Sequence, residues 1–512
     1  MKKLLSILLA ITMVTCLFAG CGGGETTAPT KVVGGNTTAP TGATNGDGTT
    51  NGDTPTDPTE STSGGIVVED LKGITDTTIY VGNTAGVTGA LAAIGAPFNI
   101  GIQAAFAAYN AQGGFKGLNV ELINYDDQGD ATQSVTYMNQ LVYDDEVFAI
   151  VGNFGSYAVA ANLDILIDAG VPMVYAAAGN DILFNDSAED GERAIFPVQP
   201  LNHTEGQMLI LRAFAPYEQG GMGGTKVGVL TNNDEASQTM LSGIKAEAAA
   251  SNLESKVVYQ NVAGDDFSAA INAFKNAKCD VIVIAVTGSY FSTALLAMDN
   301  ADYYPLVLTT YNNSNAAMFN AGNFLKTEYE SVLANIDIFA QAWLDITSTE
   351  YVFDTNAETP LGAAYKTLYT MMGTEYTGVV GFNEEYWTVA QNIYDYCVTQ
   401  GRNDALNMSY DSYALAGYIA GDLFCKGLAA LDASGKDLTR ANFIDIMESQ
   451  EFKVAMAGNI SFANGMRAGV QDFALTWIYD LYEFNNGVYH SASSATVSGL
   501  ISMDEFREMI GN

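Results

Sequence analysis

One stretch constrains the fold of this chain more than any other, residues 148–161, FAIVGNFGSYAVAA. A short apolar run typical of a buried strand is followed by a glycine turn, and small residues that favour a helix begin at Ser156. This order predicts a strand, a turn and a helix, with Ser156 at the N-cap. The free amides of the helix's first turn would then lie at the carboxyl end of a sheet, where they favour the binding of an anionic small molecule.

The same order returns at residues 281–298, VIVIAVTGSYFSTALLAM, where a β-branched run ends at Gly288, Ser289 and Tyr290 before a second predicted helix. Two Gly-Ser-Tyr turns indicate two similar lobes that face one cleft. The alternative is a chance match, because Gly-Ser is a common helix start and three residues make a short motif.

The amino-terminal part of the chain has a different composition. Lys2 and Lys3 precede an apolar stretch too short to span a bilayer, which is typical of an export signal over residues 1–20. Small residues directly before Cys21 resemble the lipobox of bacterial lipoproteins, and a plain secretory signal is the alternative. Residues 21–70 are rich in Gly, Thr, Asn and Pro, so we expect a disordered tether.

Charge and cysteine content exclude several classes of protein. Twenty-one Lys and Arg residues against 58 Asp and Glu residues give a net charge of −37, which argues against nucleic-acid binding and favours a soluble surface protein. Three cysteines lie in the globular body, Cys279, Cys397 and Cys425. We expect buried thiols there, with a bridge between the last two left open, and no spacing typical of a zinc site. No cofactor is expected.

Strands and helices alternate through the body of the chain. The apolar and β-branched runs that we interpret as strands are residues 77–82, 119–125, 148–151 and 171–176, and helical patterns separate them. This spacing is typical of βαβ units and a parallel sheet. The pattern restarts at residues 225–231, so the sequence predicts an α/β protein with two successive lobes.

Residues 77–155 carry VGNTAGVTG, IGIQAAFAAYNAQGGFKGLNVELINYDDQGD and VFAIVGNFGS. These motifs resemble the extracytoplasmic solute-binding proteins of the leucine/isoleucine/valine type, which form the type I periplasmic binding family of ABC importers. The resemblance implies an α/β fold of two doubly wound parallel-sheet lobes, joined by a three-crossing hinge that closes on a ligand. It also implies that the lobes comprise residues 71–198 plus 336–474 and residues 199–335 plus 475–512.

The ligand contacts of this family are transferred by position. The serine whose hydroxyl and amide hold the ligand carboxylate falls on Ser156. The next contact segment falls on Ala177, Ala178 and Gly179, which lack the threonine hydroxyl that the family usually offers there.

Of three further contact positions of the family, two are occupied by residues that differ from the usual ones and one keeps an apolar residue. The aromatic contact falls on Thr287, the acid that pairs with an α-ammonium falls on Tyr311, and the apolar wall falls on Ile94. The resemblance therefore leaves two ligands open, an amino-acid-like solute or a neutral or aromatic acid or amide. The family's half-cystines fall on Gly129 and Gly155, so that disulfide is absent.

Other side chains near the predicted strand ends are candidates as well. Asp234 could take the place of the missing acid, although an acidic loop is more often a solvated turn. Tyr157, Tyr290 and Tyr311 could line the cleft, although packing is the commoner role of a tyrosine.

An enzyme is poorly supported. His203 and His490 are the only histidines, no nucleophile elbow or zinc-protease motif occurs, and the glycine-rich residues 220–224 stand before a strand instead of after one. The acids of residues 126–130 could form a calcium loop, but a strand end followed by a helix cap accounts for them.

The sequence thus predicts a monomeric substrate-binding lipoprotein, anchored outside the membrane by lipid on Cys21 and partnered by the permease and ATPase subunits of an ABC importer. The alternative is a ligand-sensing lipoprotein of the same fold that reports to a separate receptor. Residues 336–407 are either an insertion at the cleft edge or additional packing.

Overall fold

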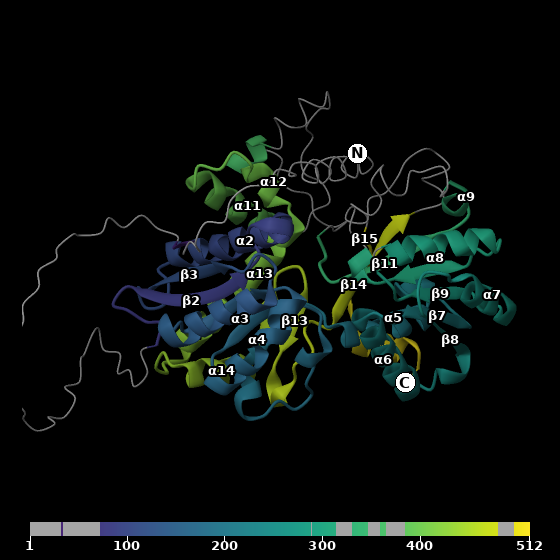
Figure 1. Cartoon of the computed structure of the whole chain (residues 1–512), viewed down its shortest axis with the longest axis horizontal. Helices are drawn as coiled ribbons and strands as arrows, with labels where there is room; N and C mark the ends of the chain where they lie inside the picture. The colour runs from purple at the N-terminus through teal and green to yellow at the C-terminus, as the bar shows by residue number, and fades with distance from the viewer. Residues whose placement is uncertain are drawn as a thin grey trace, which may run out of the picture.

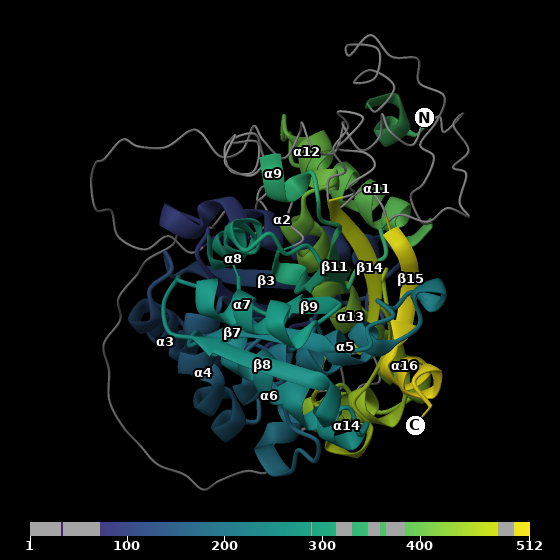
Figure 2. The same cartoon turned by 90° about the vertical axis from the view of Figure 1, so that its right-hand side faces the viewer.

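A computed structural model describes residues 32–33, 72–287, 289–313, 330–346, 359–364, 384–479 and 496–511. The predicted signal peptide, Cys21, most of the tether, Gly288, His490 and parts of residues 336–407 lie outside these ranges. Figure 1 shows two lobes side by side, each built around its own sheet, and Figure 2 shows the second lobe in front of the first.

The first sheet has six strands. Its order is β1 (Val32–Val33), β3 (Asn119–Asp126), β2 (Thr78–Ala85), β4 (Ala149–Phe154), β5 (Met173–Ala177) and β6 (Ile195–Phe196). All neighbouring pairs are parallel except β1 with β3. The two valines of β1 lie in the segment predicted as a disordered tether, and the structure corrects that expectation for these β-branched residues, which pair with the open edge of β3.

The second sheet has seven strands. Its order is β15 (Thr496–Ser502), β14 (Asp472–Tyr479), β11 (Ile338–Ala342), β10 (Leu306–Thr309), β9 (Val281–Ile284), β7 (Val227–Asn232) and β8 (Val257–Val262). The five strands from β8 to β11 are parallel, whereas β14 and β15 run antiparallel at the other edge. A separate hairpin joins β12 (Glu451–Val454) to β13 (Gly458–Ser461).

Helices cover both faces of each sheet (Figure 1). Those of the first lobe are α2 (Ala92–Ala111), α3 (Ala131–Asn139), α4 (Ser156–Ala169), α11 (Glu384–Thr399), α12 (Ala405–Ser409), α13 (Ser412–Ser434) and α14 (Arg440–Ser449). Those of the second lobe are α5 (Asn202–Phe214), α6 (Glu235–Ala250), α7 (Ser268–Ala277), α8 (Ser289–Asn300), α9 (Glu330–Leu333) and α16 (Met503–Met509).

Each sheet separates two apolar clusters, as a doubly wound fold requires. In the first lobe α2, α11 and α13 pack on one face and α3 and α4 on the other. In the second lobe α7 and α8 pack on one face and α5 and α6 on the other. The predicted fold class, two α/β lobes with parallel-sheet cores, is therefore confirmed.

One helix pair in each lobe packs at backbone distance through reciprocal glycines. A β-carbon on Gly101 of α2 would lie 2.0 Å from the Ala414 carbonyl oxygen of α13, and one on Gly417 of α13 would lie 1.8 Å from that of Phe98 in α2. In the second lobe, a β-carbon on Gly243 of α6 would lie 1.9 Å from the His203 carbonyl oxygen of α5. Only glycine permits these approaches.

Helix α13 is long and apolar enough to cross a membrane by length and composition, but most of it is buried inside the first lobe, as expected for a core helix of a soluble domain. Helix α11 packs in the same cluster, so this described part of residues 336–407 serves as packing. The thiols of Cys279, Cys397 and Cys425 are buried, as predicted, and the bridge between Cys397 and Cys425 that the sequence left open is not formed.

The lobe boundaries need one correction. Strand β11 pairs with β10 and β14 in the second sheet, whereas residues from 336 onward were assigned to the first lobe.

Two of the segments that cross between the lobes lie side by side. The amide of Val470 donates to the Val198 carbonyl at 2.8 Å, and the Thr204 hydroxyl donates to the Ala468 carbonyl at 2.8 Å.

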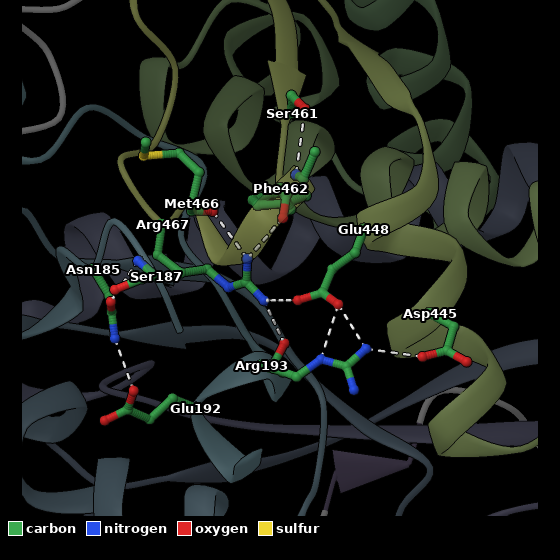
Figure 3. Close-up of polar contacts among 11 residues, drawn as sticks. Asn185, Ser187, Glu192, Arg193, Asp445, Glu448, Ser461, Phe462, Met466 and Arg467 are labelled. Atoms are coloured by element: carbon green, nitrogen blue, oxygen red, sulfur yellow. Dashed lines mark hydrogen bonds and ion pairs between the residues drawn. The ribbon is translucent and has the colours of Figure 1, made fainter. Parts of the chain in front are cut away.

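A buried arginine anchors the chain ahead of these crossings (Figure 3). The Arg467 guanidinium donates to the backbone carbonyls of Phe462, Met466 and Arg193 and pairs with Glu448 at 2.5 Å. Arg193 pairs with the same carboxylate at 2.7 Å. Burial lowers the pKa of Arg467, and its pairing with Glu448 opposes that shift. The cluster fastens the segment before β6 to α14 and to the loop after β13.

Candidate functional site

The strand orders place a candidate site at one edge of each sheet. Strand β2 lies between β3 and β4, and β7 lies between β8 and β9, so the direction of chain progression reverses at β2/β4 and at β7/β9. Ligands of open parallel sheets bind outside the carboxyl ends of the strands at such switch points. Ser156 follows β4, Asp234 follows β7 and Thr287 follows β9, so these predicted residues lie at switch points.

The amino-terminal end of α4 differs by one residue from the prediction. Gly155 is the N-cap, with φ of 95°, and Ser156 is the first helical residue, so the predicted N-cap at Ser156 is wrong. Glycine is required because its φ is positive and because a β-carbon there would lie 2.5 Å from the Tyr157 ring. Ser156 is exposed, and within the described chain its hydroxyl has no hydrogen-bond partner. The Ser156 hydroxyl is therefore free to donate to an anion at the start of α4, where the sequence predicted an anion site.

The side chain of Tyr157 is occupied by an intrachain contact. Its hydroxyl donates to Asp127 at 2.8 Å, and the amide of Gly129 donates to the same carboxylate oxygen at 3.0 Å. Burial raises the pKa of Asp127, and burial together with Asp127 raises the pKa of Tyr157 above its ordinary value. Tyr157 therefore fixes the first turn of α4 against the end of β3.

The other two acids of this region have separate structural roles. Asp126 accepts from the amides of Val87 and Thr88 at 3.0 and 3.3 Å and so holds the turn after β2. Asp130 is the N-cap of α3 and accepts from the amide of Gln133 at 2.8 Å, as predicted for a capped helix start. No group of three potential metal ligands occurs among the described residues.

The carboxyl ends of β4 and β5 lie side by side in the first sheet. Phe154 of β4 and Ala177 of β5 are paired in register, and the amide of Gly155 donates to the Ala177 carbonyl at 3.2 Å. Ala178 is buried, and the carbonyl of Gly179 accepts from the amide of Asn202 at 3.0 Å. The structure thus brings this segment together with the end of α4. Ile94 lies on α2 and packs partly buried against the core of the first lobe.

In the second lobe, Asp234 is the exposed N-cap of α6, and its carboxylate accepts from the Asn232 side chain at 2.7 Å. Thr287 is half-buried directly after β9. Tyr290 packs edge-on against Phe267, with ring centroids 6.4 Å apart, within an apolar cluster. Asp234 is therefore partly committed to its own loop, and Tyr290 contributes to packing.

Tyr311 contacts an acidic residue, Glu205, that the sequence alone did not identify. The Tyr311 amide donates to the carboxylate of Glu205 at 2.7 Å, and the Thr310 hydroxyl donates to it at 2.8 Å. Glu205 is fully buried in the first turn of α5, and burial raises its pKa to about 7. The position of Glu205 in the first turn of a predicted helix could be seen in the sequence. Only the three-dimensional structure shows that its hydrogen-bond partners, Thr310 and Tyr311, follow β10.

Three contacts join the lobes near these strand ends. The side-chain amide of Asn180 donates to Glu235 at 3.2 Å, and Asp181 of η3 (Asp181–Leu183) lies 3.9 Å from His203 Nδ1. The ring of Phe184 packs on that of His203 with centroids 4.6 Å apart. The segment after β5 thus meets the starts of α5 and α6 at the lobe boundary.

Comparisons with known proteins agree with this architecture. The profile of a family described as periplasmic binding protein matches residues 78–323. The Leu/Ile/Val-binding protein homolog 2 of Brucella abortus is 29% identical over 214 residues, which are 40% of this chain and 53% of that protein. The chain thus spans about half the length of this curated relative.

Solved structures match over more of their length. The fatty acid ABC transporter substrate-binding protein of Thermomonospora curvata has a TM-score of 0.54 at 16% identity, and the match covers 86% of this chain and 96% of that one. A branched-chain amino acid transporter substrate-binding protein of Streptococcus pneumoniae, in complex with isoleucine, has a TM-score of 0.50 at 16% identity, covering 83% and 100%. At these identities the likeness concerns the fold.

Proposed function

Because this chain is a type I periplasmic binding protein of the leucine/isoleucine/valine-binding type, we propose that it is the solute-capturing subunit of an ABC importer. It binds a small amino-acid-like solute between its lobes and delivers it to a membrane permease with an ATPase subunit. The ligand is a branched-chain amino acid or a related hydrophobic or aromatic acid or amide. We propose no catalytic step.

The observation that carries this proposal is the open amino-terminal end of α4. Ser156 is exposed with a free hydroxyl, and it lies at the β2/β4 switch point beside the end of β5. Helix amides and their dipole favour a carboxylate there without any cationic side chain. Such a site suits reversible binding, because the exposed Ser156 hydroxyl and the helix amides bind water when the ligand is absent and the carboxylate when it is present.

Attachment to the membrane is part of the proposal. Lipid on Cys21 would anchor the chain outside the cytoplasmic membrane, and the segment between Cys21 and β1 would tether the first lobe to it. A chain with a net charge of −37 is not attracted to anionic lipid headgroups, so lipid on Cys21 would supply the membrane contact that charge does not. The second candidate is a sensor, in which the same ligand-bound lobes contact a separate receptor instead of a permease.

A thermal-shift screen of the purified protein tests the binding function. Ligand at about one hundred times its dissociation constant adds about 2.7 kcal/mol to the free energy of unfolding. We expect stabilisation by at least one branched-chain or aromatic amino acid, 2-keto acid or amide. No shift with any of them would contradict the proposed solute class. Loss of uptake on deletion of the gene, with the permease intact, separates the importer from the sensor.

A further inference from the structure

Tyr175 has a backbone conformation that tyrosine rarely adopts. It lies in the middle of β5 with φ of 64°, in the left-handed region, where a residue with a β-carbon is strained. Val174 and Tyr175 both pack in the apolar cluster on the α2 and α13 face of the sheet, whereas successive residues of a regular strand face opposite sides. The positive φ therefore turns the Tyr175 side chain to a face that a regular strand would not give it.

The neighbouring strand has the same irregularity, but with glycine. Asn153 of β4 pairs with Ala176 of β5, so Gly152 lies beside Tyr175 in the sheet. Gly152 has φ of 74°, a conformation that glycine adopts without strain. Tyrosine lacks this freedom, and a strained backbone persists only where the surrounding contacts offset its cost. The contacts of the Tyr175 side chain therefore indicate what the strain serves.

The Tyr175 side chain is fully buried and ends at the first crossing between the lobes. Its ring packs against that of Phe98, with centroids 5.7 Å apart, and its hydroxyl donates to Gln199 Oε1 at 3.3 Å. Gln199 lies between β6 and α5, where the chain passes to the second lobe. The other crossing of the pair packs on the same residue, since a β-carbon on Gly469 would lie 2.3 Å from the Gln199 carbonyl oxygen. Tyr175 thus contacts the point where two crossings meet.

Tyr311 reaches the same crossing from the second lobe. Its hydroxyl donates to the Pro200 carbonyl at 3.4 Å, and its amide donates to Glu205 at 2.7 Å. Burial and the Coulombic effect of Tyr311 raise the pKa of Tyr175 well above its ordinary value, as expected for hydroxyls that lie near each other. Two tyrosines, one from each lobe, therefore hold consecutive residues of one crossing, Gln199 and Pro200.

We propose that Tyr175 and Tyr311 are positioning residues for the closure of the lobes, because their hydroxyls hold the crossing at Gln199 and Pro200 in the arrangement in which the lobes touch. Neither hydroxyl contacts the ligand in this role. The inference rests on the proposed function in one respect, that closure of the lobes captures a solute.

Loss of either hydroxyl should make the lobes separate more often. In this structure the lobes are in contact, for example where the Phe184 ring packs on that of His203. The hydrogen bonds of the two tyrosines belong to this arrangement, and both are long for a hydroxyl donor, so a small movement of the lobes is enough to break them. Because the apparent affinity for a ligand scales with the fraction of binding-competent protein, every ligand should be weakened by the same factor.

Pulsed electron paramagnetic resonance measures the distance between the lobes without any ligand. Nitroxide labels are attached to the full-length protein at Ala160→Cys in α4 and Ala246→Cys in α6, because both positions are exposed and the two helices belong to different lobes. The native thiols of the lobes are buried, and Cys16→Ser and Cys21→Ser remove the other two.

The variants Tyr175→Phe and Tyr311→Phe remove one hydroxyl each and keep the ring. In the ligand-free protein, each should shift the distance distribution towards longer distances, with the ratio of separated to touching lobes rising about threefold or more. Calorimetry then compares leucine, valine and phenylalanine, and those that bind should all be weakened by one common factor of the same size.

Tyr396→Phe is the matched control. The Tyr396 hydroxyl also donates to a glutamine oxygen, that of Gln103 at 2.8 Å, but both residues lie in the first lobe, on α11 and α2. This variant should lose a comparable hydrogen bond while the distance between the lobes stays unchanged.

Each contrary result has a distinct meaning. An unchanged distance distribution in Tyr175→Phe or in Tyr311→Phe overturns the inference, and so does the same shift in Tyr396→Phe. Losses of affinity that differ from one ligand to another also overturn it, because the hydroxyl would then contact the ligand. If none of the three amino acids binds, that result counts against the proposed solute class, whereas the ligand-free distances still decide the role of the two tyrosines.

Discussion

Buried charges in the second lobe are balanced by backbone dipoles. Glu205 lies in the first turn of α5 and Arg212 in its last turn, and both are fully buried. Arg212 donates to the carbonyls of Gly220 and Phe473 at 2.8 and 2.6 Å, and burial lowers its pKa to about 9. An acid at the amino end and a base at the carboxyl end both suit the helix dipole. Among the residues that the structure describes, no oppositely charged side chain pairs with Glu205 or Arg212, and backbone groups hold each of them in place.

Glu205 should make stability depend on pH. Its pKa rises from 4.5 to about 7 on folding, so between these values the folded state binds more protons than the unfolded state. The free energy of unfolding therefore falls as pH rises through this window, by at most about 3 kcal/mol at 1.36 kcal/mol per unit. Urea unfolding of the wild type and of Glu205→Gln between pH 5 and pH 8 measures this, and the variant should lose this part of the slope. Identical slopes would contradict the prediction.

Ser156 should contribute directly to ligand affinity. Ser156→Ala removes one uncharged donor to a carboxylate, so we expect binding to weaken by about 1–2 kcal/mol while unfolding changes little, because the hydroxyl has no partner in the described chain. Ser268→Ala, at the first position of α7 after the edge strand β8, is the control away from the switch points. Calorimetry with the ligand found in the screen checks this, and an unchanged dissociation constant for Ser156→Ala would remove the residue from the site.

Among the helices and strands, periodicity and turn residues predicted most of the regular structure near the site. The run at residues 148–151 and the helix start at Ser156 placed the starts of β4 and α4 within one residue, but β4 continues to Phe154, three residues beyond the predicted end of the strand. Glu205 could not be found in this way, because its partners at Thr310 and Tyr311 are more than one hundred residues away. The contact between Asn180 and Glu235 was hidden for the same reason, since it depends on how two lobes meet.

The glycine contact between α2 and α13 should be intolerant of a methyl group. In Gly417→Ala the new β-carbon would lie 1.8 Å from a backbone oxygen, so the helices must separate, at a cost of about 3 kcal/mol. Gly427→Ala in the same helix meets only side-chain atoms of Met447 and Phe443, which can move. Thermal unfolding should therefore show a large loss for Gly417→Ala and a small change for Gly427→Ala. Equal effects would contradict the close packing.

For the protein as a whole, the proposed lipid anchor on Cys21 would determine where the protein is located. Cys21→Ser removes the thiol that would be modified, so we expect the protein to leave the membrane fraction and appear in soluble form outside the cytoplasm. Fractionation followed by immunoblotting measures the distribution, with Cys279→Ser, a buried thiol of the second lobe, as the control. Retention of the Cys21→Ser protein in the membrane would show that something other than lipid at this position holds it there.

The paired crossings limit how the two lobes can move. Val198 with Val470, and Thr204 with Ala468, join two passages of the chain by hydrogen bonds of 2.8 Å, and the cluster at Arg467 fastens their approach on the first lobe. Two chain segments that are hydrogen-bonded side by side can bend together in one direction, but they resist twisting about each other. We expect these hydrogen bonds to favour one swinging motion of the lobes over twisting, so that the same pairs of atoms would face each other at every closure.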